Sequence, residues 1–147
     1  MSVAAANTRE PVFTAVASAR MAEWPYVRRE RVRFRDCDSM GHMNNAVYST
    51  FLEEARIEVV GDLADFILAR VEIDFRAQLR AGDEVEVLTR CSHIGTKSLV
   101  LEHELRVDGR PAAEARSVLV GYDYEQEQSV VLSDAVRARL SGSQALA

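Results

Sequence analysis

The stretch from Asn44 to Val60 contains neither glycine nor proline, and it constrains the fold of this chain more than any other feature. Its apolar residues recur at every fourth position and so share one helical face: Val47, Phe51, Ala55 and Val59. Asn44 or Asn45 can cap the start of such a helix, and Gly61 can supply the left-handed residue after its end. At 1.5 Å per residue the helix is about 25 Å long, enough to cross a sheet.

Five segments alternate apolar and polar residues, the pattern of half-buried strands. The first is Arg31–Asp36, where Val32 and Phe34 share a face. The other four follow the helix and place apolar residues, with one histidine, at alternate positions: Val71, Ile73 and Phe75; Val85, Val87 and Cys91; Leu99, Leu101, His103 and Leu105; Val118, Val120 and Tyr122. Short turns join these four strands, and Asp108-Gly109 is the strongest hairpin signal among them.

The order of elements is therefore strand, long helix, and four strands in succession, with a short C-terminal helix over Ala135–Leu140. Burying every amphipathic element predicts an α+β fold: a long central helix on the apolar face of one five-stranded antiparallel sheet. No GxGxxG or P-loop pattern occurs in the sequence, which disfavours a doubly wound nucleotide-binding fold.

The length of 147 residues predicts a single domain over residues 24–141. Residues 1–23 are interpreted as a flexible N-terminal arm, with one or two helical turns around Val12–Arg20, and residues 142–147 as a frayed tail. The net charge of −5 makes the chain a poor general binder of phosphate backbones, so no nucleic-acid partner is expected.

Two cysteines, Cys37 and Cys91, cannot form a disulfide framework. The N-terminal segment lacks the pattern of a signal peptide, and no apolar run approaches the ~20 residues that span a bilayer. These observations predict a cytoplasmic protein that has no membrane partner.

The densest polar cluster lies between the first strand and the helix, in residues 36–45. It combines the carboxylates of Asp36 and Asp38, the imidazole of His42 and a flexible glycine, Gly41, with a helix N-terminus that favours negative charge. Acyl transfer needs these parts: a base or nucleophile and donors for an oxyanion. The alternative interpretation is a polar turn in which one aspartate bonds the backbone and His42 is solvated.

Other reactive side chains are weaker candidates. Two flanking carboxylates should raise the pKa of the Cys37 thiol, so it is not the expected nucleophile. A metal site built from Cys37, His42, Cys91 and His93 lacks the paired spacing of zinc ligands, and no metal is expected.

Two further titratable side chains have ordinary structural interpretations. His103 falls on the apolar side of its strand, as a satisfied core or interface histidine does. Glu54 is interpreted as solvated or ion-paired, with Glu58 and Arg56 near it, and is the second-choice catalytic carboxylate.

The loop and helix resemble a known family. The pattern D-x-D-x-x-G-H-x-N-N-x-x-Y from Asp36 to Tyr48, followed by the sequence FLEEAR in residues 51–56, is similar to the signature of hot-dog-fold acyl-CoA thioesterases, in particular the 4-hydroxybenzoyl-CoA thioesterase and YbgC-like family. The resemblance continues through the turns at residues 81–83 and 95–98 and covers about residues 27–123.

This resemblance implies a hot-dog fold that assembles as a dimer or tetramer, with active sites between subunits. It implies an acyl-CoA substrate and no cofactor, because coenzyme A is part of the substrate. Asp38 matches the catalytic carboxylate, acting as nucleophile or general base. Asn45 matches the residue whose backbone N–H holds the thioester carbonyl oxygen, and His42 matches a histidine thought to orient or polarise the thioester.

The resemblance also supplies candidate substrate-binding residues: Gly41, Asn44, Tyr48, Glu54, Lys97 and Ser98. Asn44 and Asn45 replace the aromatic residues that line the 4-hydroxybenzoyl pocket, which favours an aliphatic or unusual acyl group. Basic residues near strand ends and turns are candidates to meet the phosphates of coenzyme A: Arg76, Arg80, Arg90 and Lys97.

Two other functions fit parts of the pattern. Hot-dog hydratases and dehydratases of enoyl or 3-hydroxyacyl thioesters carry His five residues after the Asp, whereas His42 follows Asp38 by four residues and Asp36 by six. A non-catalytic acyl-CoA-binding regulatory module would be joined to a DNA-binding unit, and an arm of 23 residues is too short for a helix-turn-helix. Thioester hydrolysis is the favoured prediction.

Overall fold

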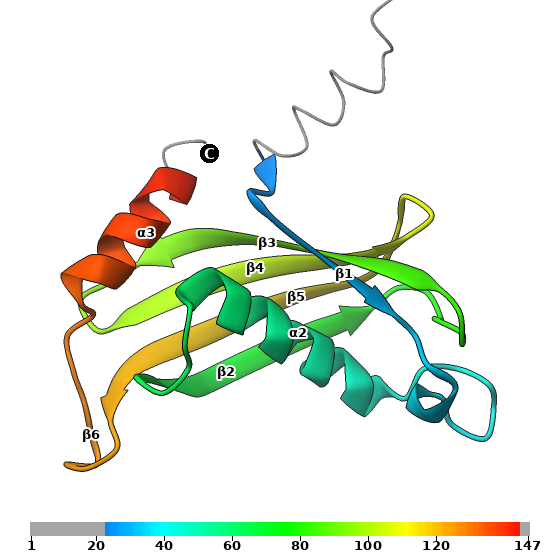
Figure 1. The fold of residues 1–147 in the computed structure, drawn as a ribbon, viewed down its shortest axis with the longest axis horizontal. Coiled ribbons are helices and arrows are strands. Elements are labelled where there is room, and N and C mark those ends of the chain that lie inside the picture. Colours follow the sequence, from blue (N-terminus) through cyan, green and yellow to red (C-terminus); the bar gives the residue numbers. More distant parts are fainter. Residues whose placement is uncertain (1–22, 145–147) are drawn as a thin grey trace, which may run out of the picture.

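A computed structural model of the chain describes residues 23–144. Figure 1 shows its elements, which follow in chain order: β1 (Tyr26–Arg31), the 3-10 helix η1 (Phe34–Asp36), α2 (Asn45–Val60), β2 (Phe66–Phe75), β3 (Glu84–Ile94), β4 (Ser98–Val107), β5 (Arg110–Asp123), β6 (Gln128–Ser129) and α3 (Asp134–Gln144). The helical turns predicted around Val12–Arg20 lie outside the described residues.

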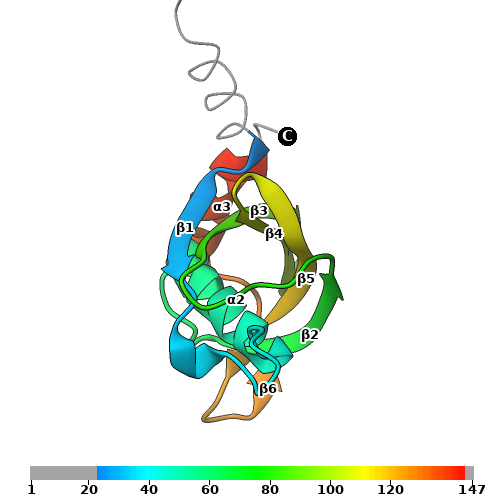
Figure 2. The same ribbon diagram turned by 90° about the vertical axis from the view of Figure 1, so that its right-hand side faces the viewer.

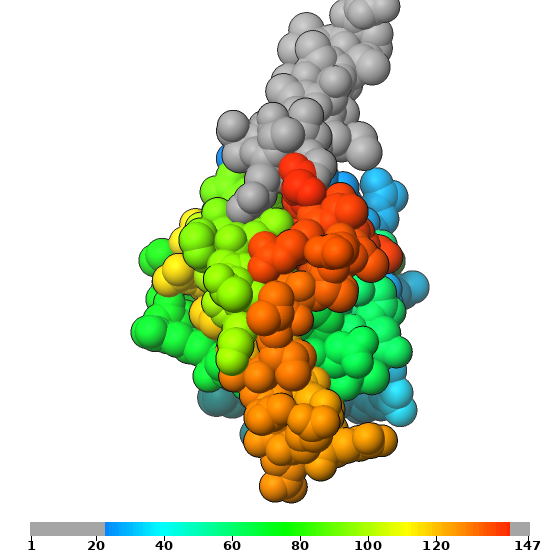
Figure 3. Space-filling model, turned by 90° about the vertical axis from the view of Figure 1, so that its left-hand side faces the viewer, coloured from blue at the N-terminus to red at the C-terminus, as the bar shows by residue number. Residues whose placement is uncertain are grey.

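The strands form one antiparallel sheet in the order β1-β3-β4-β5-β2, and the short β6 pairs with β5. Seen end-on, the sheet curves around α2 (Figure 2). At the opposite end from η1, the segment after β5 leads to α3, which packs against β3 and α2 (Figure 3). The predicted α+β architecture, a long helix on the apolar face of an antiparallel sheet, is confirmed.

The central helix begins and ends where the sequence predicts. The Asn44 side chain caps the helix by accepting a hydrogen bond from the Ala46 N–H, and Gly61 ends it at a φ of 89°. Three of the four predicted apolar positions, Phe51, Ala55 and Val59, are buried, and the fourth is partly buried.

The strand predicted over Arg31–Asp36 is wrong. The first strand ends at Arg31, and residues 34–36 form the 3-10 helix η1. The Asp36 carboxylate accepts a hydrogen bond from the Arg33 backbone N–H at 2.8 Å, which turns the backbone out of the extended conformation. Phe34, predicted to face the core, is therefore 91% exposed.

The remaining elements occur as predicted, with different limits, but the face predicted for the last strand is wrong: β5 buries Ser117 and Leu119, not Val118 and Val120. The strand predicted around Val71–Phe75 begins earlier, at Phe66, and the C-terminal helix extends to Gln144 instead of ending at Leu140. Asp108 and Gly109 both have positive φ, as the predicted hairpin requires. No helix among the described residues is long and apolar enough to cross a membrane.

The core holds a buried histidine. His103 is 2% exposed, and its two ring nitrogens lie 2.9 Å from the Thr89 hydroxyl and 3.1 Å from the Ser117 hydroxyl. Burial, with the nearby Arg56, lowers the pKa of His103 to about 3. Its interpretation as a satisfied core histidine is confirmed.

This burial predicts acid sensitivity. The unfolded chain protonates His103 below its ordinary pKa of 6.5, whereas the folded chain does so only near pH 3. Between these values the unfolded state binds the extra proton, so this histidine should lower the free energy of unfolding by about 1.4 kcal/mol per pH unit as the pH falls. Denaturant unfolding from pH 7 to pH 4 measures the slope, and His103→Gln should remove this part of it. Equal slopes in the two proteins would contradict the prediction.

Candidate active site

The loop between η1 and α2 folds back on itself. The Asp38 N–H donates to the His42 carbonyl at 2.8 Å, and the Gly41 N–H donates to the Asp38 carbonyl at 3.0 Å. Gly41 adopts a φ of +81°, a conformation that other residues rarely take. Met43 is buried, and its N–H donates to the Leu79 carbonyl at 2.7 Å. The loop is thereby fixed to the sheet.

The two aspartates of the motif have different environments. Asp36 is 5% exposed and ion-paired with Arg33 at 3.0 Å, and the hydrogen bond from Arg33 lowers the pKa of this carboxyl. Asp38 is half-buried, and its Oδ1 accepts hydrogen bonds from the backbone N–H groups of Met40 at 2.9 Å and His42 at 3.4 Å. Within residues 23–144, Asp38 Oδ2 has no hydrogen-bond partner. Asp36 therefore holds the loop, and Asp38 keeps one oxygen available for chemistry.

Asp38 lines a pocket of about 400 Å³. One wall comes from the loop and the first turns of α2, and the other comes from the end of β2 and the residues after it. The lining residues are Asp38, Met40, His42, Met43, Asn44, Asn45, Tyr48, Phe75, Arg76, Ala77 and Gln78. The structure therefore brings together the three predicted catalytic residues, Asp38, His42 and Asn45, in one pocket.

The start of α2 supplies hydrogen-bond donors to this pocket. The Ala46 N–H is satisfied by the Asn44 side chain at 3.0 Å, whereas the Asn45 N–H has no partner among the described residues. Free N–H groups and the helix dipole at such a position favour a negatively charged oxygen. The pocket thus combines a carboxylate with a donor suited to an oxyanion.

Tyr48 is a core residue that also forms part of the pocket wall. It is 2% exposed, its hydroxyl donates to the Ala77 carbonyl at 3.5 Å, and burial raises the pKa of its hydroxyl. Its ring meets the Phe75 ring edge to face at a centroid distance of 4.9 Å. Phe75, Ala77 and Gln78 were not predicted as site residues, because nothing in the local sequence indicates that the end of β2 lies beside the loop.

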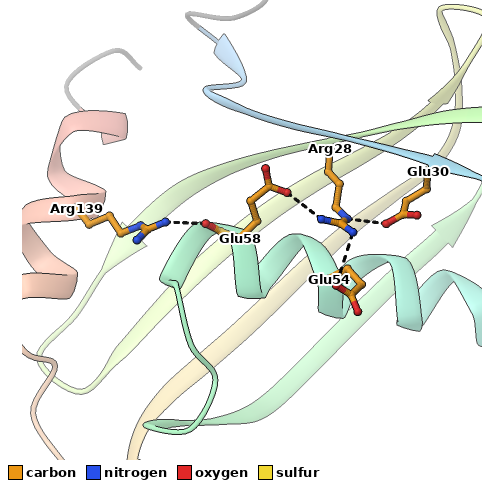
Figure 4. A network of polar contacts seen from close by, with 5 residues as sticks. All are labelled: Arg28, Glu30, Glu54, Glu58 and Arg139. Carbon is orange, nitrogen blue, oxygen red and sulfur yellow. Dashed lines mark hydrogen bonds and ion pairs between the residues drawn. The ribbon is translucent and has the colours of Figure 1, made fainter.

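Glu54, predicted to bind substrate, lies outside the pocket. It forms an ion pair at 3.7 Å with Arg28 of β1, which also pairs with Glu30 and Glu58 (Figure 4). Arg139 of α3 donates to the Glu58 carbonyl at 2.8 Å. These contacts join β1 and α3 to the side of α2, in agreement with the interpretation of Glu54 as an ion-paired residue.

Lys97 and Ser98 lie at the other end of the sheet. The Lys97 carbonyl accepts the Gly121 N–H at 2.8 Å, and Gly121 pairs with Phe66, the first residue of β2. A second cavity of about 470 Å³ lies at this end, lined in part by Phe66, Gly121 and Tyr122. Within one chain, the structure therefore separates these two predicted site residues from Asp38 by the length of β2.

The basic candidates also separate. Arg76 lines the Asp38 pocket and pairs with Glu114 at 2.9 Å. Arg80 is exposed and lies at the same end of the sheet as Arg76. It comes just before the turn that is hydrogen-bonded to Val32. Arg90 stacks on Trp24 at 4.5 Å and does not line the Asp38 pocket. Within the described residues, no three His, Cys, Asp or Glu side chains are grouped so as to hold a metal ion.

A family model described as the thioesterase-like superfamily matches residues 32–140. The chain belongs to this superfamily. It is similar to a thioesterase from Thermus thermophilus whose structure contains coenzyme A and zinc, with 34% identity and a TM-score of 0.76 over 84% of this chain and 96% of that one. It is also similar to a predicted thioesterase from Bacillus stearothermophilus, with 26% identity and a TM-score of 0.76 over 80% of this chain and 95% of that one.

A curated relative, the uncharacterized protein YsmA of Bacillus subtilis, is 27% identical in an alignment that covers 74% of this chain and 80% of YsmA. Together with the superfamily match, the structural neighbours confirm the predicted hot-dog fold. The matched region contains the whole Asp38 pocket, so the family resemblance and the geometry concern the same residues.

Proposed function

We propose that this member of the thioesterase-like superfamily is an acyl-CoA thioesterase, which hydrolyses a thioester to a free acid and coenzyme A. The observation that carries the proposal is that one pocket contains both the Asp38 Oδ2 oxygen and the Asn45 N–H, neither of which has a hydrogen-bond partner among the described residues. The coenzyme A in the T. thermophilus relative supports the choice of substrate class.

The proposed chemistry needs few groups. With Asp38 as general base, its carboxylate takes a proton from water while the oxygen of that water bonds to the thioester carbonyl carbon. The Asn45 N–H holds the carbonyl oxygen as it becomes negative, a contribution of about 3 kcal/mol for one such donor. The C–S bond then breaks, and the thiolate of coenzyme A takes up the proton. His42, which is half-buried in the same pocket, orients the thioester.

Asp38 as nucleophile gives the same products by a different route. Its free oxygen then bonds to the carbonyl carbon, the thiolate leaves, and water hydrolyses the resulting anhydride. A single turnover in ¹⁸O-labelled water distinguishes the two routes, because only the anhydride route can leave the label on Asp38.

We propose that the complete site forms between two copies of the chain. β2 is an edge strand with four exposed large apolar residues: Ile67, Leu68, Val71 and Phe75. An edge of this kind can pair with another strand. Antiparallel pairing of two β2 strands about a two-fold axis places the Phe75 end of one beside the Phe66 end of the other. The Asp38 pocket, which includes Phe75, then faces the partner's Lys97 and the partner's Ser98.

Thiol release from a panel of acyl-CoAs tests the proposed function. The panel contains short, medium and long aliphatic chains together with benzoyl and 4-hydroxybenzoyl groups. We expect turnover of one aliphatic class, since Asn44 and Asn45 line the pocket at the positions where the family resemblance places the aromatic residues of a 4-hydroxybenzoyl site. Tight binding without turnover of any thioester would instead indicate a non-catalytic acyl-CoA-binding module, and hydration of an enoyl-CoA would indicate a hydratase.

A further inference from the structure

Four polar side chains form a hydrogen-bonded chain through the core, one from each of four elements. Thr89 of β3 contacts His103 Nδ1 of β4 at 2.9 Å, and His103 Nε2 contacts the Ser117 hydroxyl of β5 at 3.1 Å. Arg56 Nη1 of α2 donates to the same hydroxyl at 3.3 Å. All four residues are at most 4% exposed. We call Arg56, Thr89, His103 and Ser117 the polar layer.

The polar layer divides the core into two apolar clusters. Each of the four elements places one inward-facing residue on either side of the layer. The residue on one side always belongs to the first apolar cluster, and the residue on the other side always belongs to the second. The pairs are Ala55 and Val59 around Arg56, Val87 and Cys91 around Thr89, Leu105 and Leu101 around His103, and Ala115 and Leu119 around Ser117. The layer therefore lies at one level across the helix and three strands.

Arg56 is the charged member of this layer. Its Nε is buried without a hydrogen-bond partner, and it forms no ion pair within residues 23–144. Burial lowers the pKa of its guanidinium, and the negative charge of Glu53 partly offsets this lowering. Because an arginine side chain stays protonated in proteins, this group carries a buried charge satisfied chiefly by Ser117. Buried polar groups of this kind stabilise little, but they can specify one packing arrangement against others.

The alternative arrangement is a shift of α2 along the sheet. The inward face of α2 is apolar on both sides of Arg56, and so are the strand positions on both sides of the layer. A shift by one helical turn of about 5.4 Å would therefore still pack apolar side chains together. The same shift would move the guanidinium away from Ser117 and against leucine side chains. Inside the core, the polar layer is what penalises this shift, whereas the Met43 and Arg28 contacts oppose it from outside the core.

The position of α2 decides the shape of the Asp38 pocket. Asn45 and Tyr48 on α2 form one wall, and Phe75 at the end of β2 forms part of the other. The edge-to-face contact between Tyr48 and Phe75 is where the two walls meet. We propose that Arg56 is a positioning residue: through the polar layer it sets the register of α2 on the sheet, and thereby the place of the Asn45 N–H in the pocket. The inference rests on the proposed thioesterase function.

An apolar-layer variant tests this inference. It combines Arg56→Met, Thr89→Val, His103→Leu and Ser117→Ala, which keep the approximate volumes and remove the polar groups. We expect it to fold with a Tm no lower than that of the wild type, because well-packed apolar residues often replace buried charged clusters without loss. We expect its kcat to fall about a hundredfold with little change in KM, since a displacement of about 1 Å can have that effect.

Two single variants keep the inference testable if the combined variant does not fold. Arg56→Lys keeps a hydrogen-bond donor on a side chain of similar length, and it should retain kcat within about threefold. Ser117→Ala removes the hydroxyl that accepts the hydrogen bond from Arg56, and it should also lower kcat, as the combined variant does. Unchanged kcat in Ser117→Ala, or equal losses in Arg56→Lys and Ser117→Ala, would overturn the inference.

A structural readout separates this inference from the proposed function. Nuclear Overhauser contacts between the Tyr48 and Phe75 rings, and the amide resonance of Asn45, report the register of α2 without any substrate. Both should change in the apolar-layer variant or in Ser117→Ala and persist in Arg56→Lys. Unchanged signals, or a kcat that falls only with the folded fraction, would show a merely structural role. If the wild type hydrolyses no thioester, the proposed function fails and these signals alone decide the inference.

Discussion

Asp38→Asn is expected to lower kcat for thioester hydrolysis by about 10³-fold, within the range known for removal of a general acid or base. The amide oxygen of asparagine can still accept the hydrogen bonds that Asp38 Oδ1 accepts from Met40 and His42, so the loop should keep its shape. What the variant loses is the charge and basicity of the second oxygen. Thiol release measures the rate, and thermal unfolding should show a nearly unchanged Tm.

Asp83→Asn is the matched control for this substitution. Asp83 also accepts a backbone hydrogen bond through its carboxylate, from the Arg80 N–H at 2.8 Å, but it does not line the Asp38 pocket. Its variant should keep wild-type turnover. Full activity in Asp38→Asn would remove Asp38 from the mechanism, and Asp36→Asn could not take its place as a test, since Asp36 does not line the pocket and its carboxylate is ion-paired with Arg33.

Features carried by local sequence were predictable. The limits of α2 follow from Asn44 and Gly61, which satisfy the helix ends wherever the helix packs. The Asp108-Gly109 hairpin likewise depends on the backbone conformations that these two residues tolerate. The loop cluster was predictable as a candidate site because Asp38, Gly41 and His42 lie within five residues of one another.

Features that depend on distant contacts, and one local side-chain contact, were not predictable. Residues 31–36 alternate as a strand does, yet the Asp36 side chain bonds the Arg33 backbone and bends the chain. The polar layer was missed because Thr89 and Ser117 are ordinary strand residues when each is considered alone. Nothing in the sequence indicates that Lys97 and Asp38 lie at opposite ends of the sheet, because the family resemblance covers both residues without giving their distance.

A charge on the free edge of β2 is expected to abolish both assembly and activity. Val71 lies in the middle of β2 and is 38% exposed. In the proposed dimer Val71→Lys places two like charges beside the two-fold axis, so the chain should become monomeric, and the Asp38 pocket then loses the partner's Lys97. Sedimentation velocity measures the assembly, and we expect turnover to fall at least about a hundredfold.

Val27→Lys on the other edge strand, β1, is the matched control. Val27 is half-buried and pairs with Leu88 of β3, so the substitution adds the same charge to the opposite edge of the sheet. This variant should stay assembled and active, with some loss of stability. A monomeric Val27→Lys and a dimeric Val71→Lys would place the interface on β1 and refute the proposed pairing of β2.

Mixed dimers test whether one site uses residues of two chains. Asp38→Asn and Lys97→Ala should each reduce activity when expressed alone. Co-expressed in equal amounts, half of the dimers contain one chain of each kind, and in each of these one site carries both substitutions while the other carries neither. Activity should therefore recover to about a quarter of the wild-type value. If Asp38 and Lys97 acted in a site within one chain, every site would carry one substitution, and no mixing of chains could restore the activity.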